Sequence, residues 1–262
     1  MKKSKEPGTP PAGPAPKRRR IALPRTRRRR AAAAAGGLLV FLLILLACAT
    51  LGDPLSRAYS RYHAVDWANE TWPGHDFRVT DVQFEPFWCY YVTVQASDSI
   101  DTHFTLTVVA GIVRRTDYEL AVDNLQNTKQ RFFDSLYSDV QNALTAAGYA
   151  PVGGSDFSVT VGDPNLAMDH TLTLDMPYDK GNIPPRTSLW VNGWSDAPDA
   201  EQGEAILREV YRIITEAGID IDEYAVTIYD ASYAGRYGAS PDADNRDDTY
   251  ESGWVTGSEL AD

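Results

Sequence analysis

The chain has 262 residues, and its 36 acidic against 25 basic side chains give a formal net charge of −11. Residues 1–30 hold twelve Lys and Arg with one Glu, residues 31–51 hold no charged side chain, and residues 52–262 hold thirteen basic and thirty-five acidic side chains. This reversal excludes a uniform soluble domain. It also argues against binding to nucleic acid, because the acidic part would repel phosphate.

The basic leader, residues 1–30, is rich in Pro and Gly at its start and in Arg at its end. Such a composition predicts a disordered tail. Its arginines can be read as a nuclear-import or nucleic-acid patch. An uncharged apolar run follows directly, so we interpret them instead as charge that keeps the tail cytoplasmic and attracts anionic lipid.

Residues 31–51 form an uncharged run of 21 residues, AAAAAGGLLVFLLILLACATL. As a helix this run is about 31 Å long, which matches the hydrocarbon core of a bilayer. The sequence therefore predicts a transmembrane helix with the lipid bilayer as its partner. The expected location is the cell membrane, single-pass, with the N-terminus cytoplasmic and the C-terminal domain outside.

Two alternatives keep this apolar run out of the mature protein. Ala47-Cys48-Ala49 fits a signal-peptidase site, which would give a cleaved, secreted protein. Leu45-Leu46-Ala47-Cys48 approximates a lipoprotein box, in which Cys48 would carry the lipid. The leader and the apolar run are both long for a signal peptide, so a retained anchor is the expectation.

The first outer unit is expected over residues 52–149. Asp53-Pro54 is typical of a helix start. Apolar periodicity then predicts a helix to about Trp72, strands over 76–84, 88–96 and 103–109, and a helix over 120–147.

The second outer unit is expected over residues 150–239. The pattern predicts strands over 156–161, 170–176, 188–193 and 224–229, with a helix over 200–217. DFRVT at residue 76 recurs as DFSVT at residue 156, which raises the hypothesis of two βββα-type units. The fold class is α+β: an N-terminal transmembrane helix followed by an extracytoplasmic antiparallel α/β domain. Residues 240–262 are expected to form an acidic disordered tail.

A family resemblance rests on the apolar and aromatic pattern. An anchor leads into a Tyr/Trp-bearing helix, then DFRVTDVQFEPFWCYYVTVQ, HFTLTVV, and later ILREVYRIITEAGI with EYAVTIYD. Over residues 35–230 this resembles the YfjL-like single-pass membrane-anchored proteins of Gram-positive bacteria. The resemblance implies topology and α+β architecture and no catalytic residues. The long Arg-rich leader and the acidic tail depart from that family's compact form.

No metal or cofactor site is expected. The four histidines, His63, His75, His103 and His170, form no HxH, HxxxH or HExxH pair. His75 and His103 would approach each other only if their strands paired. The acidic run of Asp242, Asp244, Asp247 and Asp248 fails the EF-hand pattern, which needs Gly at its sixth position and Glu at its twelfth, where this run has Asp247 and Gly253.

No catalytic residue is assigned either. Cys89 lies in an apolar run and is interpreted as a small buried side chain. Asp220 and Asp222 form an acidic pair in a turn after a helix, without an acid/base role. Gly153-Gly154-Ser155 precedes a strand, so it reads as a linker and not as a phosphate loop.

Aromatic side chains crowd the start of the outer part. The set comprises Trp67, Trp72, Phe84, Phe87, Trp88, Tyr90 and Tyr91. It can be read as a platform for a glycan or partner, or as the core of the first unit with an interfacial belt at Trp67 and Trp72; the core reading is the expectation. Asn69-Glu70-Thr71 is a glycosylation sequon.

We expect a membrane-anchored extracytoplasmic protein that acts as a non-enzymatic binding or accessory module. An envelope protein or the cell wall would be its partner. The alternatives are an anchored envelope hydrolase that uses acidic residues, a cleaved or lipidated secreted protein, and a sensor that signals through its basic tail. Convergent carboxylates of different pKa would favour the hydrolase.

Overall fold

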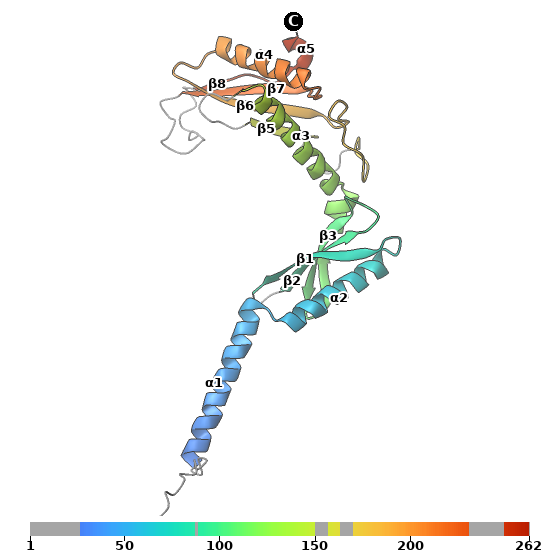
Figure 1. Cartoon of the computed structure of the whole chain (residues 1–262), viewed down its shortest axis with the longest axis vertical. Helices are drawn as coiled ribbons and strands as arrows, with labels where there is room; N and C mark the ends of the chain where they lie inside the picture. Colours follow the sequence, from blue (N-terminus) through green and yellow to red (C-terminus); the bar gives the residue numbers. More distant parts are fainter. Residues whose placement is uncertain (1–26, 87–88, 150–156, 163–169, 231–248, 262) are drawn as a thin grey trace, which may run out of the picture. The chain divides into compact units, whose positions relative to one another are not determined.

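The computed structural model describes residues 27–86, 89–149, 157–162, 170–230 and 249–261 (Figure 1). The chain separates into two compact units, Met1–Leu51 and Gly52–Asp262. The first unit contributes helix α1, and the second contains the two β-sheets. Each unit is described in turn.

Helix α1 spans Arg27–Leu51 and is 25 residues long. It begins four residues before the predicted span, because helical geometry continues into the arginines. Its large apolar side chains from Leu38 to Leu46 are about half exposed or more. Among the described residues, α1 is the helix whose length and composition would allow it to cross a membrane.

Helix α2, Pro54–Thr71, begins where the sequence predicts. The Asp53 carboxylate accepts a hydrogen bond of 2.8 Å from the Ser56 backbone N–H, and this bond holds the pKa of Asp53 below its usual value. The buried side of α2 carries the small residues Ser60, Ala64 and Ala68. Small side chains let the helix axis lie close to the sheet beneath it.

The first sheet is an antiparallel meander in the order β1-β2-β3-β4. Its strands are β1 (Phe77–Glu85), β2 (Cys89–Ala96), β3 (His103–Val109) and β4 (Ile112–Thr116). Alternate residues of β2 and β3 are buried and pack with α2 into the first hydrophobic core. The three expected strands are confirmed, and β4 is an addition that a tight turn with Gly111 at φ 78° makes possible.

The helix expected over 120–147 is interrupted. A π-helical turn η1 (Glu119–Asp123) precedes α3 (Gln126–Ala146), and Leu125 between them has a left-handed φ of 57°. η1 packs in the first core, whereas α3 buries Phe132 and Leu136 in the second. The two cores therefore meet near residue 125, not at the predicted boundary of 149/150.

The second sheet has the order β5-β6-β7-β8, with β9 also paired to β7. Its elements are β5 (Phe157–Val161), β6 (Thr187–Ser195), α4 (Ala200–Glu216), β7 (Glu223–Asp230), β8 (Thr249–Glu251), β9 (Val255–Thr256) and the short α5 (Gly257–Leu260). Helices α3 and α4 contribute apolar side chains to the core on one face of this sheet, and Figure 1 shows α4 running along β6 and β7.

Three expectations about this half need correction. Residues 170–176 are not a strand: Asp175 takes a left-handed φ of 58°, and its carboxylate and backbone bond to another loop. Strands β6 and β7 are parallel, because α4 connects them as a crossover, so the sheet is mixed and its connectivity differs from that of the first sheet. Finally, residues 249–261 are structured, since β8 and β9 pair with β7; residues 240–248 lie outside the described residues.

Candidate functional site

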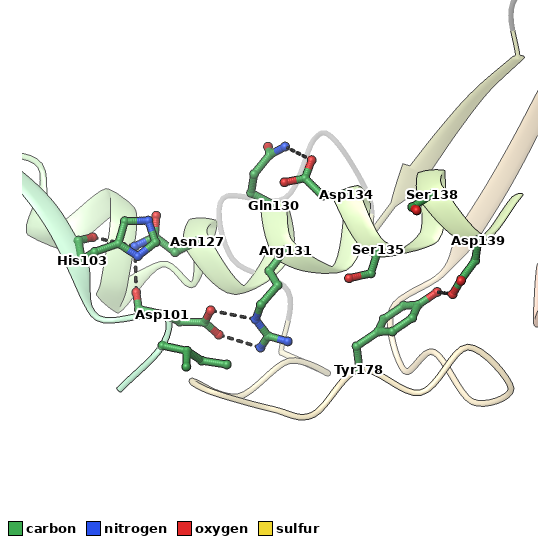
Figure 2. Close-up of a pocket in the computed structure, with 11 residues that line it drawn as sticks. Asp101, His103, Asn127, Gln130, Arg131, Asp134, Ser135, Ser138, Asp139 and Tyr178 are labelled. Atoms are coloured by element: carbon green, nitrogen blue, oxygen red, sulfur yellow. Dashed lines mark hydrogen bonds and ion pairs between the residues drawn. The ribbon is translucent and has the colours of Figure 1, made fainter. Parts of the chain in front are cut away.

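A polar groove of 640 Å³ runs along one side of α3 (Figure 2). It is lined by Ile100, Asp101, His103, Asn127, Gln130, Arg131, Asp134, Ser135, Ser138, Asp139 and Tyr178. The β2–β3 loop, the first residue of β3, the first four turns of α3 and the loop before β6 supply these side chains. Most of them carry a hydroxyl, amide, carboxylate or guanidinium, so the groove presents hydrogen-bonding groups along one helix face.

The centre of the groove is an ion pair between Asp101 and Arg131. The Arg131 Nε and Nη2 atoms donate to the two carboxylate oxygens of Asp101 at 2.8 and 2.7 Å. The Asp101 side chain is 2% exposed and that of Arg131 is 27% exposed. The Thr128 hydroxyl adds a bond of 2.8 Å to the Asp101 carboxylate. This fork-on-fork geometry is the strong form of such a pair.

These contacts fix the charge of Asp101. Burial raises the pKa of the carboxyl, but the bonds from Arg131 and Thr128 and the guanidinium charge outweigh burial and hold the pKa below its usual value. The same contacts raise the pKa of Arg131. Asp101 is therefore ionised at neutral pH and unsuited to act as a proton donor.

A second loop joins the same network through Asp175. Its carboxylate accepts bonds from the Ser99 hydroxyl at 3.0 Å and the Asp101 backbone N–H at 2.8 Å. Its own backbone N–H donates to the Asp101 carboxylate at 3.2 Å, and Arg131 donates to the Met176 carbonyl at 2.7 Å. One buried ion pair thus ties the β2–β3 loop, α3 and the loop before β6 together.

The other polar groups of the groove are also bonded to one another. The Asn127 amide donates to the carbonyls of Asp101 and His103 at 2.8 and 2.6 Å. The Tyr178 hydroxyl donates to Asp139 at 3.0 Å (Figure 2). Burial, and then this bond, raise the pKa of Tyr178 well above its usual value. The groove is organised for hydrogen bonding.

The histidines do not converge. His75 bonds to Asp98 at 2.9 Å, His63 lies against the rings of Tyr59 and Tyr62, and His170 is exposed. His103 lies at the groove, and β2 separates β3, which His103 begins, from β1, which follows His75. Within the described ranges, no cluster of three or more His, Cys, Asp or Glu side chains could hold a metal ion.

The acidic pair and the cysteine have structural surroundings. The Asp222 carboxylate accepts bonds of 2.7 and 3.2 Å from the backbone N–H and hydroxyl of Thr187, which fastens the turn before β7 to the start of β6. Asp220 and Asp222 line a separate depression of 760 Å³. Cys89 is buried at the start of β2. The linker Gly153-Gly154-Ser155 lies outside the described residues, as do the acids between 242 and 248.

Four members of the aromatic set, Trp67, Trp72, Phe84 and Tyr90, belong to the first core, and Tyr91 is exposed. The Trp72 ring stacks on Tyr118 with centroids 4.0 Å apart and meets Phe104 at 4.9 Å. Trp67 packs against Trp72 at 5.5 Å, and Phe84 against Tyr90 at 4.9 Å. These contacts support the core reading and leave Trp67 and Trp72 unsuited to an interfacial belt. Phe87 and Trp88 lie outside the described residues.

Sequence reasoning missed the ion pair at the centre of the groove. Asp101, Arg131 and Asp175 are 30 and 44 residues apart, so no local spacing joins them. One signal was present: Thr128, Arg131, Ser135 and Ser138 recur at intervals of three, four and three. This is a polar stripe beside the apolar face of a helix, and it predicts a helix side that faces polar partners.

Comparison with known proteins gives little. No family model matches the chain, and no curated protein matches it. Among solved structures, a DUF5037 family protein from Ruminococcus gnavus ATCC 29149 aligns over 77% of this chain and 97% of its own, with 11% identity and a TM-score of 0.22. A similarity at that level carries no argument about fold or function.

Proposed function

We propose that this chain is a single-pass membrane protein whose residues 52–262 form a non-enzymatic binding module outside the cytoplasm. In this proposal α1 is the anchor and the Arg-rich leader stays in the cytoplasm. The groove along α3 binds the partner, either an envelope protein or a cell-wall polymer. The resemblance to YfjL-like anchored proteins agrees with this topology.

Support for the anchor comes from α1. Its 25 residues combine an arginine-rich beginning with an apolar run of exposed leucines. An exposed helix of this kind is unfavourable in water and favourable in lipid. Arginines on one side of an apolar span favour the cytoplasm. Residues 52–262 are acidic overall and hold no basic cluster as dense as the one at the start of α1.

The single observation that favours binding over catalysis is that the Asp101 carboxylate is already paired with hydrogen-bond donors of the protein. It is the most buried carboxylate of the groove, and it is held ionised by Arg131 and Thr128. A hydrolase of the acid/base type needs a carboxyl whose pKa is raised towards neutrality. The paired groups instead make a pre-ordered surface, which limits the entropy lost on binding.

The free charge of the groove suggests the class of partner. Arg131 and Asp101 neutralise each other, while Asp134 and Asp139 leave an acidic rim. Ser135 and Ser138 add hydroxyls between them. A polar segment that carries amino groups complements this surface, because its charge opposes that of the rim.

The topology can be tested by cysteine labelling in intact cells. The full chain with Cys48→Ala receives either Ser4→Cys in the leader or Ala205→Cys on the exposed side of α4. A membrane-impermeant maleimide should label residue 205 at once and residue 4 only after permeabilisation. Intact mass should equal that of the whole chain. Cleavage or lipidation near Cys48, or labelling of residue 4 from outside, would contradict the anchor.

The binding surface can be tested by site-specific photo-crosslinking. A benzophenone amino acid at Ser138, on the groove, should give a defined crosslinked product in cells, while the same group at Ala205 should not. Asp139→Asn in the Ser138 variant should reduce the yield, because it removes rim charge. Equal products from both positions, or none from Ser138, would refute a binding role for the groove.

A further inference from the structure

The outward side of α2 changes character halfway along the helix. Leu55, Tyr59 and Tyr62 are 82%, 54% and 66% exposed. Their spacing of four and three places them on one helix face. That face is opposite the buried line of Ser60, Ala64 and Ala68. We call Leu55, Tyr59 and Tyr62 the outer stripe.

The outer stripe ends within two turns. The same helix face continues with Asp66 and Glu70, which are both exposed. α2 therefore presents apolar and aromatic side chains at its beginning and carboxylates at its end. A helix that met only water would have no reason to separate the two kinds of side chain along its length.

Basic side chains follow the same division. Arg57 and Arg61 lie in the first half of α2 and line a depression of 330 Å³ against β1. The Arg57 Nη2 atom donates to the Val82 carbonyl at 2.9 Å, so the two arginines lie towards β1 and on another side of α2 than the outer stripe. Both arginine residues are nevertheless exposed.

The position of this segment in the chain suggests what covers it. Two residues, Gly52 and Asp53, separate the end of α1 from Pro54. A chain advances at most about 3.6 Å per residue, so the first turn of α2 starts within about 11 Å of the end of the apolar helix. A helix that carries an apolar and aromatic stripe on one side and arginines on another is typical of a membrane surface, where rings insert and guanidinium groups meet phosphates.

We propose that residues 54–62 lie in the headgroup layer of the bilayer that α1 crosses. The outer stripe inserts below the phosphates, Arg57 and Arg61 bind them, and Asp66 and Glu70 stay in water. This inference rests on the proposed anchor and adds a second, lateral contact with lipid. It would hold the module close to the membrane surface and not at the end of a free tether.

The test measures depth along α2 in the full chain, reconstituted in phosphatidylcholine vesicles with and without phosphatidylglycerol. The background is Cys48→Ala, and an environment-sensitive fluorophore is attached to one engineered cysteine at a time. The three positions are Tyr62→Cys in the outer stripe, Glu70→Cys about two turns later in α2 as the matched control, and Ile44→Cys within α1. Lipids spin-labelled near the headgroup serve as quenchers for residues 62 and 70, and lipids spin-labelled along the acyl chain serve as quenchers for residue 44. Emission from residue 62 should shift to the blue and be quenched strongly, and emission from residue 70 should change little.

The arginines supply a second readout. Each basic side chain near an anionic surface favours the bound state by roughly a factor of five. Arg57→Gln with Arg61→Gln should therefore lower quenching at residue 62 in vesicles that contain phosphatidylglycerol. The variant should leave quenching at residue 44 unchanged.

The other outcomes are distinct. Quenching at residue 44 without quenching at residue 62 would overturn the α2 contact and leave the anchor intact. No quenching at residue 44 would overturn the anchor itself and the α2 contact with it. A blue shift at residue 62 that vanishes in nanodiscs holding one chain each would mean that a second copy covers the outer stripe, which also overturns the lipid contact.

Discussion

At the residue scale, loss of the Asp101 charge is expected to lower the stability of the chain strongly. Asp101→Asn keeps the shape of the side chain but removes the negative charge that pairs with Arg131. It also replaces one carboxylate oxygen, so the side chain has one acceptor fewer for the bonds from Arg131, Thr128 and Asp175. Breaking a buried pair costs about 3–5 kcal/mol, and partial exposure of Arg131 places the expected loss at the lower end. Urea unfolding of the full chain in detergent should show this loss. Asp98→Asn, in the same loop but exposed, is the matched control and should leave the midpoint unchanged.

The same carboxylate predicts a dependence on pH. The pKa of Asp101 is depressed in the folded state, so its contribution to stability is present above the ordinary carboxyl pKa of about 3.9 and is lost as the pH falls through the lower, folded value. The difference in unfolding free energy between the wild type and Asp101→Asn should be constant from neutral pH to about pH 5 and should narrow below about pH 4. A difference that stays constant into strong acid would show that Asp101 is not held ionised by Arg131.

At the scale of single elements, α4 and β8 depend on one glycine. A Cβ atom at Gly203 would overlap the ring of Tyr250, so this glycine lets β8 lie close to the helix. Ala gains about 1 kcal/mol in helix propensity, but overpacking costs about 1–3 kcal/mol. Gly203→Ala should therefore lower the unfolding free energy and raise hydrogen exchange in β8.

Two further variants sharpen this prediction. Gly253→Ala is the control, since no atom lies within 4 Å of its added Cβ, and it should be neutral. Tyr250→Leu in the Gly203→Ala background shortens the obstructing side chain and should recover part of the lost stability. If Gly203→Ala alone had the same unfolding free energy as the wild type, β8 would not lie as close to α4 as described.

The sequence predicts those elements whose signal is local. α2 follows from its helix start at Asp53-Pro54, and α4 from its apolar period. Residues 170–176 alternate like a strand, yet the chain turns at Asp175, where bonds to Ser99 and Asp101 hold the loop. These partners lie 74 or more residues earlier in the chain, so the local sequence does not indicate the turn. Period-two alternation does not supply a neighbouring strand, and of the two alternating leucines Leu172 is buried whereas Leu174 is exposed.

Contacts that are distant in the sequence decided the rest. β8 and β9 are short and polar, and they are strands only because β7 offers an edge to pair with. The crossover through α4 makes β6 and β7 parallel, which the pattern of separate strands cannot distinguish from a hairpin. The groove could not be predicted for the same reason. The polar stripe on α3 is visible in the sequence, but its partner Asp101 lies in a loop distant in the chain.

At the scale of the molecule, the two hydrophobic cores share no buried residue. The Asp101 ion pair bonds a loop of the first sheet to a helix of the second core, and Asp175 adds a further link. Buried polar networks of this kind couple the parts that they join, because breaking one member leaves the others unsatisfied. The wild-type chain should therefore lose both cores in one cooperative transition.

Hydrogen exchange in increasing urea can separate the two cores, since peptides from β2 and β3 report on the first and peptides from β6 and α4 on the second. In the wild type both sets should lose protection at one urea concentration, and in Asp98→Asn they should do the same. In Asp101→Asn the less stable core should open first, because the bonds that remain, from Asn127 to the carbonyls of Asp101 and His103 and from the Ser99 hydroxyl and the Asp101 N–H to Asp175, no longer include the ion pair. If Asp101→Asn instead moved both sets together by an equal amount, the ion pair would stabilise the chain without coupling its cores, and the coupling would have to lie in the packing of η1 against α3.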